Sequence, residues 1–352
     1  MTTILATIIV LGTLIFLHEL GHFLAAKLFG VTVEKFSIGF PPTIVSKKLG
    51  ETEYALGAVP VGGYVKLAGD NPLEDDYVPS DRDLPSKSIA ARAVIISAGS
   101  IMNLLLALFL FWTVLAFHGM GEISTAPVIG GVFEGAPADS AGLLPGDSVV
   151  AVAGIPVEKW GELSKFVHPR AGIVTEFEII RGDSSFAIAL TPAPHSAMTD
   201  SGEIQIGLIG IQPSVKYLPM GIFRAIPGAF SIFGEMFLSM GIFIKRLFSS
   251  GLEKGDVGGP VLIAKMAGVS AKAGWAALLF FMAALSINLA VLNLFPFPVL
   301  DGGHLVYLFI ETIRKKPVSI KFKLVAQQVG FLILFALMIY VTVNDIFFVA
   351  RG

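Results

Sequence analysis

Four stretches of this 352-residue chain are long and apolar enough to cross a lipid bilayer, and no other feature limits its fold as strongly. A helix needs about 20 apolar residues to span the hydrocarbon core of a bilayer. Charged residues make up only 15% of the chain, whereas soluble globular proteins carry about 25%. We therefore expect a polytopic α-helical membrane protein with about four transmembrane helices, at residues 3–29, 93–117, 274–300 and 324–343.

Lysine and arginine concentrate in two of the segments that connect these apolar stretches. Cytoplasmic loops of membrane proteins carry an excess of these residues. Both basic loops should therefore lie in the cytoplasm, with both termini and the long central region on the other side of the membrane. The first loop contains Lys35, Lys47, Lys48, Lys66, Arg82 and Lys87, and the second contains Arg314, Lys315, Lys316, Lys321 and Lys323.

The rest of the composition excludes two kinds of site. The chain has no cysteine, so it has neither disulfides nor thiolate metal ligands. Its net charge is −2 and it contains no long basic run, so nucleic acid is not an expected partner.

The pattern of charges and turn residues divides the chain into three parts. Residues 1–118 form an N-terminal membrane half, in which the Gly- and Pro-rich residues 31–70 predict a membrane-associated β-hairpin region. Residues 119–215 alternate short strands and turns, which predicts one small α/β domain outside the membrane. Residues 216–352 form a C-terminal membrane half.

Residues 218–248 form an apolar run that charged residues and a proline interrupt, so the run can either cross the membrane or lie along its surface. Arg224, Pro227, Glu235, Lys245 and Arg246 break the apolar run. A helix lying in the membrane interface fits this pattern better than a fifth crossing. An even number of crossings also keeps both basic loops on one side.

The first apolar stretch carries a short group of ionisable residues, His18-Glu19-Leu20-Gly21-His22. On a helix, residues four positions apart share a face, so His18 and His22 can bind one metal ion. Glu19 can then act as the general base that takes a proton from the attacking water. Ionisable residues inside membrane spans are costly and usually functional. A metal site is therefore favoured over two interfacial histidines and a glutamate near a helix end.

A catalytic zinc usually has three protein ligands and one open position, and Asp301 is the best candidate for the third. It follows the third apolar stretch, and Pro296 and Pro298 just before it would break a helix and let the carboxylate turn inward. The charge pattern places it at the same depth as the two histidines. His304 is the competing ligand, and a turn-capping role for Asp301 is the alternative.

These motifs together resemble the site-2 protease family of intramembrane zinc metalloproteases. His18–His22 lies in the first span, Leu300-Asp301-Gly302 follows a late span, and a separate domain lies between them. More narrowly, the chain resembles the bacterial regulator-of-sigma-E protease branch of this family. Two departures concern local geometry, because Ser100 and Pro41 stand where the family usually has proline and glycine.

The resemblance implies the cofactor, the substrates and a set of substrate-binding residues. It implies Zn²⁺, and cleavage within the membrane of single-span proteins such as anti-sigma-factor-like regulators or signal-peptide remnants. It also implies location in a bacterial inner membrane, with the active site near the cytoplasmic side. The residues that it places near the substrate backbone are Asn288, Asn293, Gly62, Gly63 and Tyr64.

The central domain resembles a single PDZ domain of the bacterial protease type, on the sequence from Ala136 to Val150. Such a domain can bind a peptide as an added strand, or it can act only as a steric shield.

Three alternatives remain from the sequence. A secondary transporter would also bury ionisable residues near the middle of the membrane, but the chain shows no repeated halves. A non-catalytic membrane scaffold with a PDZ-like domain would not need the His18–His22 motif. A membrane-anchored protease acting outside the bilayer would carry that motif in a polar helix.

Overall fold

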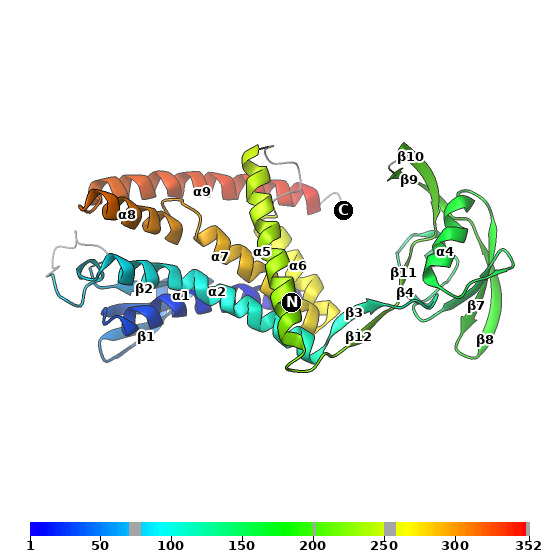
Figure 1. Ribbon diagram of the computed structural model, residues 1–352, viewed down its shortest axis with the longest axis horizontal. Helices are drawn as coiled ribbons and strands as arrows, with labels where there is room; N and C mark the ends of the chain where they lie inside the picture. The colour runs from blue at the N-terminus through cyan, green and yellow to red at the C-terminus, as the bar shows by residue number, and fades with distance from the viewer. Residues whose placement is uncertain (70–78, 200–201, 250–257, 350–352) are drawn as a thin grey trace. The chain divides into compact units, whose positions relative to one another are not determined.

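The computed structural model describes residues 1–69, 79–199, 202–249 and 258–349 (Figure 1). They form two compact units. The helical unit consists of Met1–Phe117 and Gly221–Gly352, and the inserted domain is His118–Met220. The sequence places the corresponding domain at residues 119–215.

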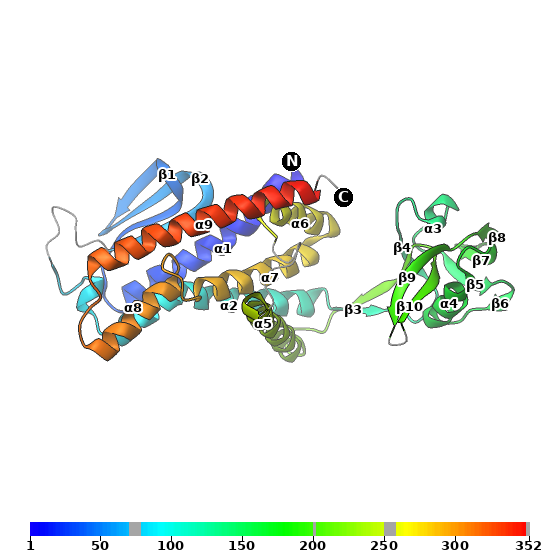
Figure 2. The same ribbon diagram turned by 90° about the horizontal axis from the view of Figure 1, so that it is seen from above.

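Four long helices of the helical unit run along a common axis. Two of them, α1 and α7, run in one direction, and α2 and α9 run in the other (Figures 1 and 2). The two groups of basic residues, which follow α1 and precede α9, therefore lie at the same end of this unit. The bounds are α1 (Thr2–Leu28), α2 (Ile89–Phe117), α7 (Trp275–Asn293) and α9 (Ile320–Val349).

Three further helices complete the unit: α5 (Ala225–Ser249), α6 (Pro260–Ala273) and α8 (Asp301–Arg314). Helix α6 packs beside α1. Its N-terminus is held by Asp345 of α9, whose carboxylate accepts hydrogen bonds from the backbone N–H groups of Gly259 and Leu262, both at 3.0 Å.

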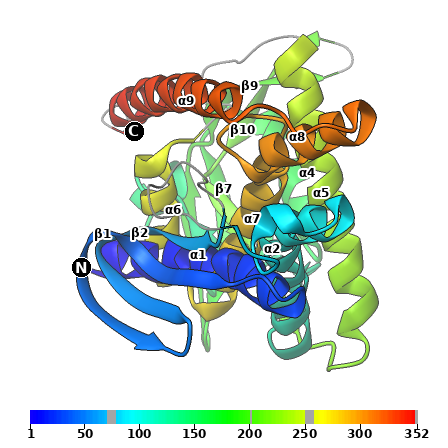
Figure 3. The same ribbon diagram turned by 90° about the vertical axis from the view of Figure 1, so that its left-hand side faces the viewer.

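Helix α5 is a further candidate for a membrane crossing, beyond the four that were predicted. By length and composition alone, five helices in the described part of the chain could cross a membrane, and one of them is Ala225–Arg246 of α5. The predicted number of four is therefore not confirmed. Helix α5 lies across the long helices rather than along them (Figure 3).

Strands β1 (Val33–Leu49) and β2 (Thr52–Leu67) pair with each other beside α1 (Figure 2). Residues 35–38 of β1 lie between two segments of β2, residues 53–56 on one side and residues 63–66 on the other, so β2 bends around them. Residues 53–56 also pair with residues 45–48, so β1 bends in the same way. Residues 63–66 pair on one side only among the described strands, so they form an edge of this sheet.

The inserted domain is a small α/β unit with its own apolar core. Phe177, Ile179, Val149, Leu143 and Leu163 lie at the centre of this core. Its main sheet has the order β6–β5–β7–β8. The elements are β3 (Met120–Ile123), β4 (Ile129–Val132), α3 (Pro137–Ser140), β5 (Ser148–Val152), β6 (Ile155–Pro156), α4 (Trp160–Val167), β7 (Thr175–Arg181), β8 (Ser184–Leu190), β9 (Ala193–Thr199), β10 (Gly202–Leu208), β11 (Ile211–Pro213) and β12 (Val215–Leu218).

Candidate metal and catalytic site

Two imidazoles from α1 form one side of the candidate site. His18 and His22 are one helical turn apart, and their rings meet edge to face with centroids 4.8 Å apart. Nδ1 of His22 lies 2.9 Å from the backbone carbonyl oxygen of Ile95. A carbonyl only accepts, so this nitrogen carries the proton and Nε2 of His22 has the free lone pair. His22 is therefore in the tautomer that can bind a cation through Nε2.

Helix α2 approaches these imidazoles more closely than a side chain would allow. A Cβ added at Gly99 would collide with Nε2 of His22 and would lie 2.8 Å from Cε1 of His18. Gly21 of α1 has the same property on the other side of the helix contact, against the backbone of Ala98. Glycine at both positions lets the two helices touch beside the histidines.

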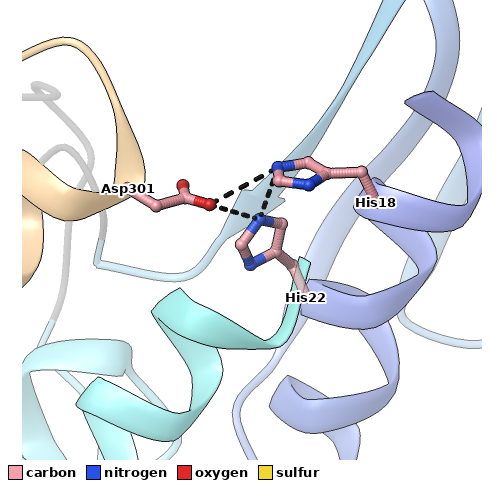
Figure 4. A group of neighbouring side chains, drawn as sticks. All are labelled: His18, His22 and Asp301. Carbon is pink, nitrogen blue, oxygen red and sulfur yellow. Dashed lines mark hydrogen bonds and ion pairs between the residues drawn. The ribbon is translucent and has the colours of Figure 1, made fainter. Parts of the chain in front are cut away.

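The third side chain comes from the turn between α7 and α8. Asp301 is the first residue of α8, and the following Gly302 and Gly303 lie against the backbone of residues 294–298, with no space for a Cβ. This close packing folds the start of α8 back toward the bundle. The Asp301 side chain caps no helix and points at the two imidazoles (Figure 4).

The three side chains converge on one small volume. Oδ2 of Asp301 lies 3.4 Å from Nε2 of His18 and 3.5 Å from Nε2 of His22, and the two Nε2 atoms are 3.3 Å apart. Four tetrahedral ligands at about 2.0–2.2 Å from a zinc ion lie about 3.3–3.6 Å from one another. The observed separations fall in this range. The same Oδ2 is buried and makes no hydrogen bond, which fits an oxygen directed at a cation.

The charge of Asp301 suits this arrangement. Burial raises the pKa of its carboxyl group, but the interactions with the neighbouring imidazoles of His18 and His22 outweigh burial and lower the pKa below its ordinary value. Asp301 therefore carries a negative charge at neutral pH and can serve as an anionic ligand.

Glu19 lies next to the sheet edge. Its carboxylate accepts a hydrogen bond from the backbone N–H of Val65, and a Cβ at Gly63 would lie 3.3 Å from its Cγ. The unpaired side of residues 63–66 thus faces the side chain expected to act as general base.

The other residues singled out from the sequence lie at different distances from the cluster. Nδ2 of Asn293 is 3.4 Å from Nε2 of His18. Asn288 is exposed on α7 and makes no hydrogen bond to the three side chains. His304, the alternative ligand, instead accepts a hydrogen bond from Nε2 of Gln327 at 3.3 Å. Within the described residues, the group that could hold a metal ion is His18, His22 and Asp301 alone.

Gly62 and Tyr64 belong to the sheet edge. Gly62 has a φ of +142° and packs against the ring of Phe40, and Tyr64 pairs with Ser37. Gly99 and Asn103 of α2 flank the departure at Ser100, and no role was assigned to them from the sequence, although both lie beside the histidines. Their spacing of four residues was a usable signal, because it places both on one face of a helix.

A family model described as peptidase family M50 matches residues 6–337 of the chain. The chain belongs to this family. Peptidase family M50 is the site-2 protease family that the motifs resemble, so the protein is a metalloendopeptidase of the site-2 protease type. Membership leaves the transporter and scaffold alternatives without support.

Relatives of similar length support zinc as the metal. A protein from Clostridium perfringens is 35% identical over 345 residues, which cover 98% of each chain. One from Clostridium acetobutylicum is 35% identical over 343 residues and 97% of each chain. One from Mesorhizobium japonicum is 32% identical over 367 residues and 98% of each chain. All three carry the name "putative zinc metalloprotease".

Two solved structures resemble the inserted domain weakly. The PDZ domain of an SdrC-like protein from Listeria monocytogenes is 19% identical with a TM-score of 0.21, and it covers 27% of this chain and 93% of its own. The corresponding domain from Listeria innocua is 19% identical with the same TM-score and covers 25% and 92%. The PDZ-like fold of the inserted domain therefore remains a prediction.

Proposed function

We propose that this M50 peptidase cleaves transmembrane segments of single-span membrane proteins, with zinc held by His18, His22 and Asp301. The observation that carries the proposal is the convergence of three ligand atoms, at separations of 3.3–3.5 Å, inside a bundle of apolar helices. A zinc ion held there would polarise the peptide carbonyl and activate water for attack at neutral pH.

Glu19 is the proposed general base. It follows His18 directly in the chain, so its carboxylate is held next to the metal ligands by the same helix. It would take a proton from the attacking water and pass it to the leaving amine. Its side chain is only partly buried, which leaves it within reach of a substrate.

The sheet edge at residues 63–66 is the proposed docking site for the substrate backbone. A transmembrane helix has all its backbone groups paired internally, so it must unwind before a peptide bond can be cut. An unpaired edge can then pair with the freed N–H and C=O groups. Gly63 and Val65 lie beside Glu19, so a strand docked there would pass the general base. Asn293, next to His18, would hold the opened strand from the other side.

The bundle geometry supports the proposed orientation. The two basic groups lie at one end of the helical unit, and the positive-inside rule places that end in the cytoplasm of a bacterial inner membrane. Both termini and the inserted domain would then be extracytoplasmic. Because α5 lies across the four long helices (Figure 3), we propose that it lies along the membrane interface.

The substrates that this family assignment favours are anti-sigma-factor-like regulators and signal-peptide remnants. The inserted domain would select among them. A groove of about 190 Å³ lies between α4 and residues 207–211, with Trp160, Leu163 and Val167 on its helical side. Such a groove could take a peptide strand, and a steric shield that admits only trimmed substrates is the alternative.

The decisive experiment uses purified protein in liposomes with a single-span substrate, with and without a chelator. We expect cleavage inside the apolar segment, mapped by mass, which chelation abolishes and added zinc restores. The Glu19→Gln variant should keep its zinc and lose about 10²–10⁴-fold in rate. Cleavage that survives chelation, or that maps outside the apolar segment, would refute the proposal.

A pair of proline variants tests the docking edge. Val65→Pro removes the backbone N–H that bonds Glu19 at this edge, and Ala58→Pro interrupts β2 between the paired residues Gly57 and Val59. We expect the first variant to lose cleavage much more than the second, with equal zinc content. Equal cleavage by the two variants would remove residues 63–66 from the mechanism.

A further inference from the structure

Asn103 of α2 is completely buried, and its side-chain amide lies against His18. Its Nδ2 atom is 3.3 Å from Nδ1 of His18, and its Oδ1 atom is buried without a hydrogen-bond partner. Its backbone carbonyl oxygen accepts a hydrogen bond from Oγ of Ser286 on α7, at 2.7 Å. The residue is therefore fixed between three helices, with one amide atom on an imidazole.

The two imidazoles are supported from a single stripe of α2. Ile95, Gly99 and Asn103 follow one another at intervals of four residues and so share one helix face. Ile95 offers its carbonyl oxygen to His22, and Gly99 has no side chain between the helices. Asn103 occupies the position that faces His18. Each ring thus has one partner on α2, on the side away from Asp301.

The tautomer of His18 decides which amide atom of Asn103 must face it. Rotating the amide by half a turn exchanges its oxygen and nitrogen without changing its shape. If Nδ2 faced the ring, Nδ1 would be the acceptor and the proton would sit on Nε2, which then could not bind a cation. If Oδ1 faces the ring, it accepts the Nδ1–H, and Nε2 keeps its lone pair on the side of Asp301.

We propose that Asn103 is a positioning residue for the metal site: its Oδ1 accepts the Nδ1–H of His18 and fixes the tautomer in which Nε2 can bind the metal. The proposal rests on the metal site of the proposed function. It gives His18 the same arrangement that the Ile95 carbonyl gives His22. Partners of this kind orient a histidine ligand and raise its basicity, and their loss typically weakens metal binding about 10–100-fold.

Three variants of the full-length protein test this role through metal affinity. Asn103→Leu keeps the approximate size and removes the hydrogen bond. Asn103→Asp keeps an acceptor and removes the donor. Ser286→Ala removes the bond to the Asn103 backbone and leaves the amide in place. Affinity for Zn²⁺ is measured by competition with a chromophoric chelator, and the absorption spectrum of bound Co²⁺ reports the ligand geometry.

We expect Asn103→Leu to bind Zn²⁺ about 10–100-fold more weakly, while Asn103→Asp and Ser286→Ala stay within a few-fold of the unmodified protein. The Co²⁺ spectrum should change only in the leucine variant. If Asn103→Asp binds as weakly as Asn103→Leu, the amide donates to His18 and the proposal is wrong. Equal affinity of Asn103→Leu and the unmodified protein also overturns it.

The experiment separates this inference from the proposed function. Failure of the unmodified protein to bind Zn²⁺ would refute the metal site itself. Failure of the Asn103 variants to differ, with tight binding by the unmodified protein, would refute only the role of Asn103. Thermal unfolding of each variant shows whether a loss of affinity reflects a loss of fold, and rescue by aspartate cannot arise from packing alone.

Discussion

Asp147 of the inserted domain and Asp301 of the helical unit are both largely withdrawn from water, and their surroundings differ in kind. The Asp147 side chain is 1% exposed and accepts hydrogen bonds from Nε and Nη2 of Arg181, at 2.6 and 2.7 Å, and from the N–H of Leu144 at 2.8 Å. The Asp301 side chain is 20% exposed, and its buried Oδ2 makes no hydrogen bond and faces two imidazole nitrogens.

This difference separates a structural carboxylate from a proposed metal ligand. Buried polar atoms in proteins are almost always hydrogen-bonded, and each exception calls for an explanation. Asp147 needs none beyond the fold, because its neighbours satisfy both oxygens. A cation shared with His18 and His22, as proposed, would account for the unsatisfied oxygen of Asp301. Removing the two carboxylates should therefore have opposite consequences for metal binding and for stability.

The largest effect is expected for Asp301→Asn. The neutral amide removes the anionic ligand, so zinc affinity should fall by more than the roughly 10–100-fold that loss of a supporting partner causes, and cleavage should fall with it. Elemental analysis of purified protein and a cleavage assay measure the two losses. A variant that retains stoichiometric zinc would show that Asp301 is no more a ligand than Asp147.

Gly99→Ala should have the next largest effect, because the added methyl group collides with both imidazoles. We expect zinc affinity and cleavage to fall at least about tenfold, in the range seen for displaced ligands. Gly12→Ala on α1 is the matched control, since a Cβ there meets nothing within 4 Å. If the two variants behave alike, close contact between α2 and the histidines is unimportant for the site.

A smaller effect is expected from breaking the ion pair between Arg92 of α2 and Glu311 of α8. Nη1 of Arg92 lies 3.1 Å from Oε2 of Glu311, and the other nitrogen of the fork bonds Oε1. Hydrogen bonding to Arg92 lowers the pKa of Glu311. Glu311 lies on the helix that starts with Asp301, so we expect the pair to hold the proposed third ligand in place.

Reversing both charges of this pair tests that role. Arg92→Glu and Glu311→Arg should each lower zinc affinity several-fold, and the double variant should recover part of the loss. Coupling between contacting residues is typically about 0.5–3 kcal/mol. Losses in the single variants that simply add in the double variant would show that the pair does not act on the site.

The smallest effect on the active site is expected for Asp147→Asn. It should destabilise the inserted domain by about 1–3 kcal/mol, the cost of a poorly satisfied charged group, and leave zinc content unchanged. Hydrogen exchange of β5 and β7 amides in the full-length protein measures the loss of stability. A drop in zinc content would contradict the separation between the two aspartates.

The same residue predicts a pH dependence of the inserted domain. Hydrogen bonds from Arg181 lower the pKa of Asp147, although burial opposes them. A carboxyl group with a lowered pKa in the folded state stabilises fully above its unfolded pKa of about 3.9 and loses that contribution as the pH falls through the folded value. Exchange protection should therefore fall below about pH 4 in the unmodified protein and change less in Asp147→Asn.

Much of the site was predictable from the sequence because its chemistry is encoded locally. The spacing of His18 and His22 needs only the period of a helix. Asp301 was identified by its isolation among apolar residues and by the prolines before it. The short strands and turns expected between residues 119 and 215 are present, together with the helix α4.

The features that were missed depend on contacts between distant segments. Strand β12 pairs with β3, nearly a hundred residues earlier, and neither has a strong pattern of its own. The contacts of Gly99 and Asn103 with the two histidines form only because α2 lies against α1. Helix α5 shows a different limit, because its length and hydropathy suit a crossing, whereas its direction depends on packing against α2.

Strands β3 and β12 pair from Met120 with Leu218 to Ile123 with Val215, and the N–H of Gly221 bonds the carbonyl oxygen of Ala116. The chain thus departs from the helical unit and returns to it at a single point. Every residue of the proposed catalytic centre lies outside this excursion. The inserted domain could therefore be exchanged, shortened or duplicated without displacing any residue of the proposed catalytic centre.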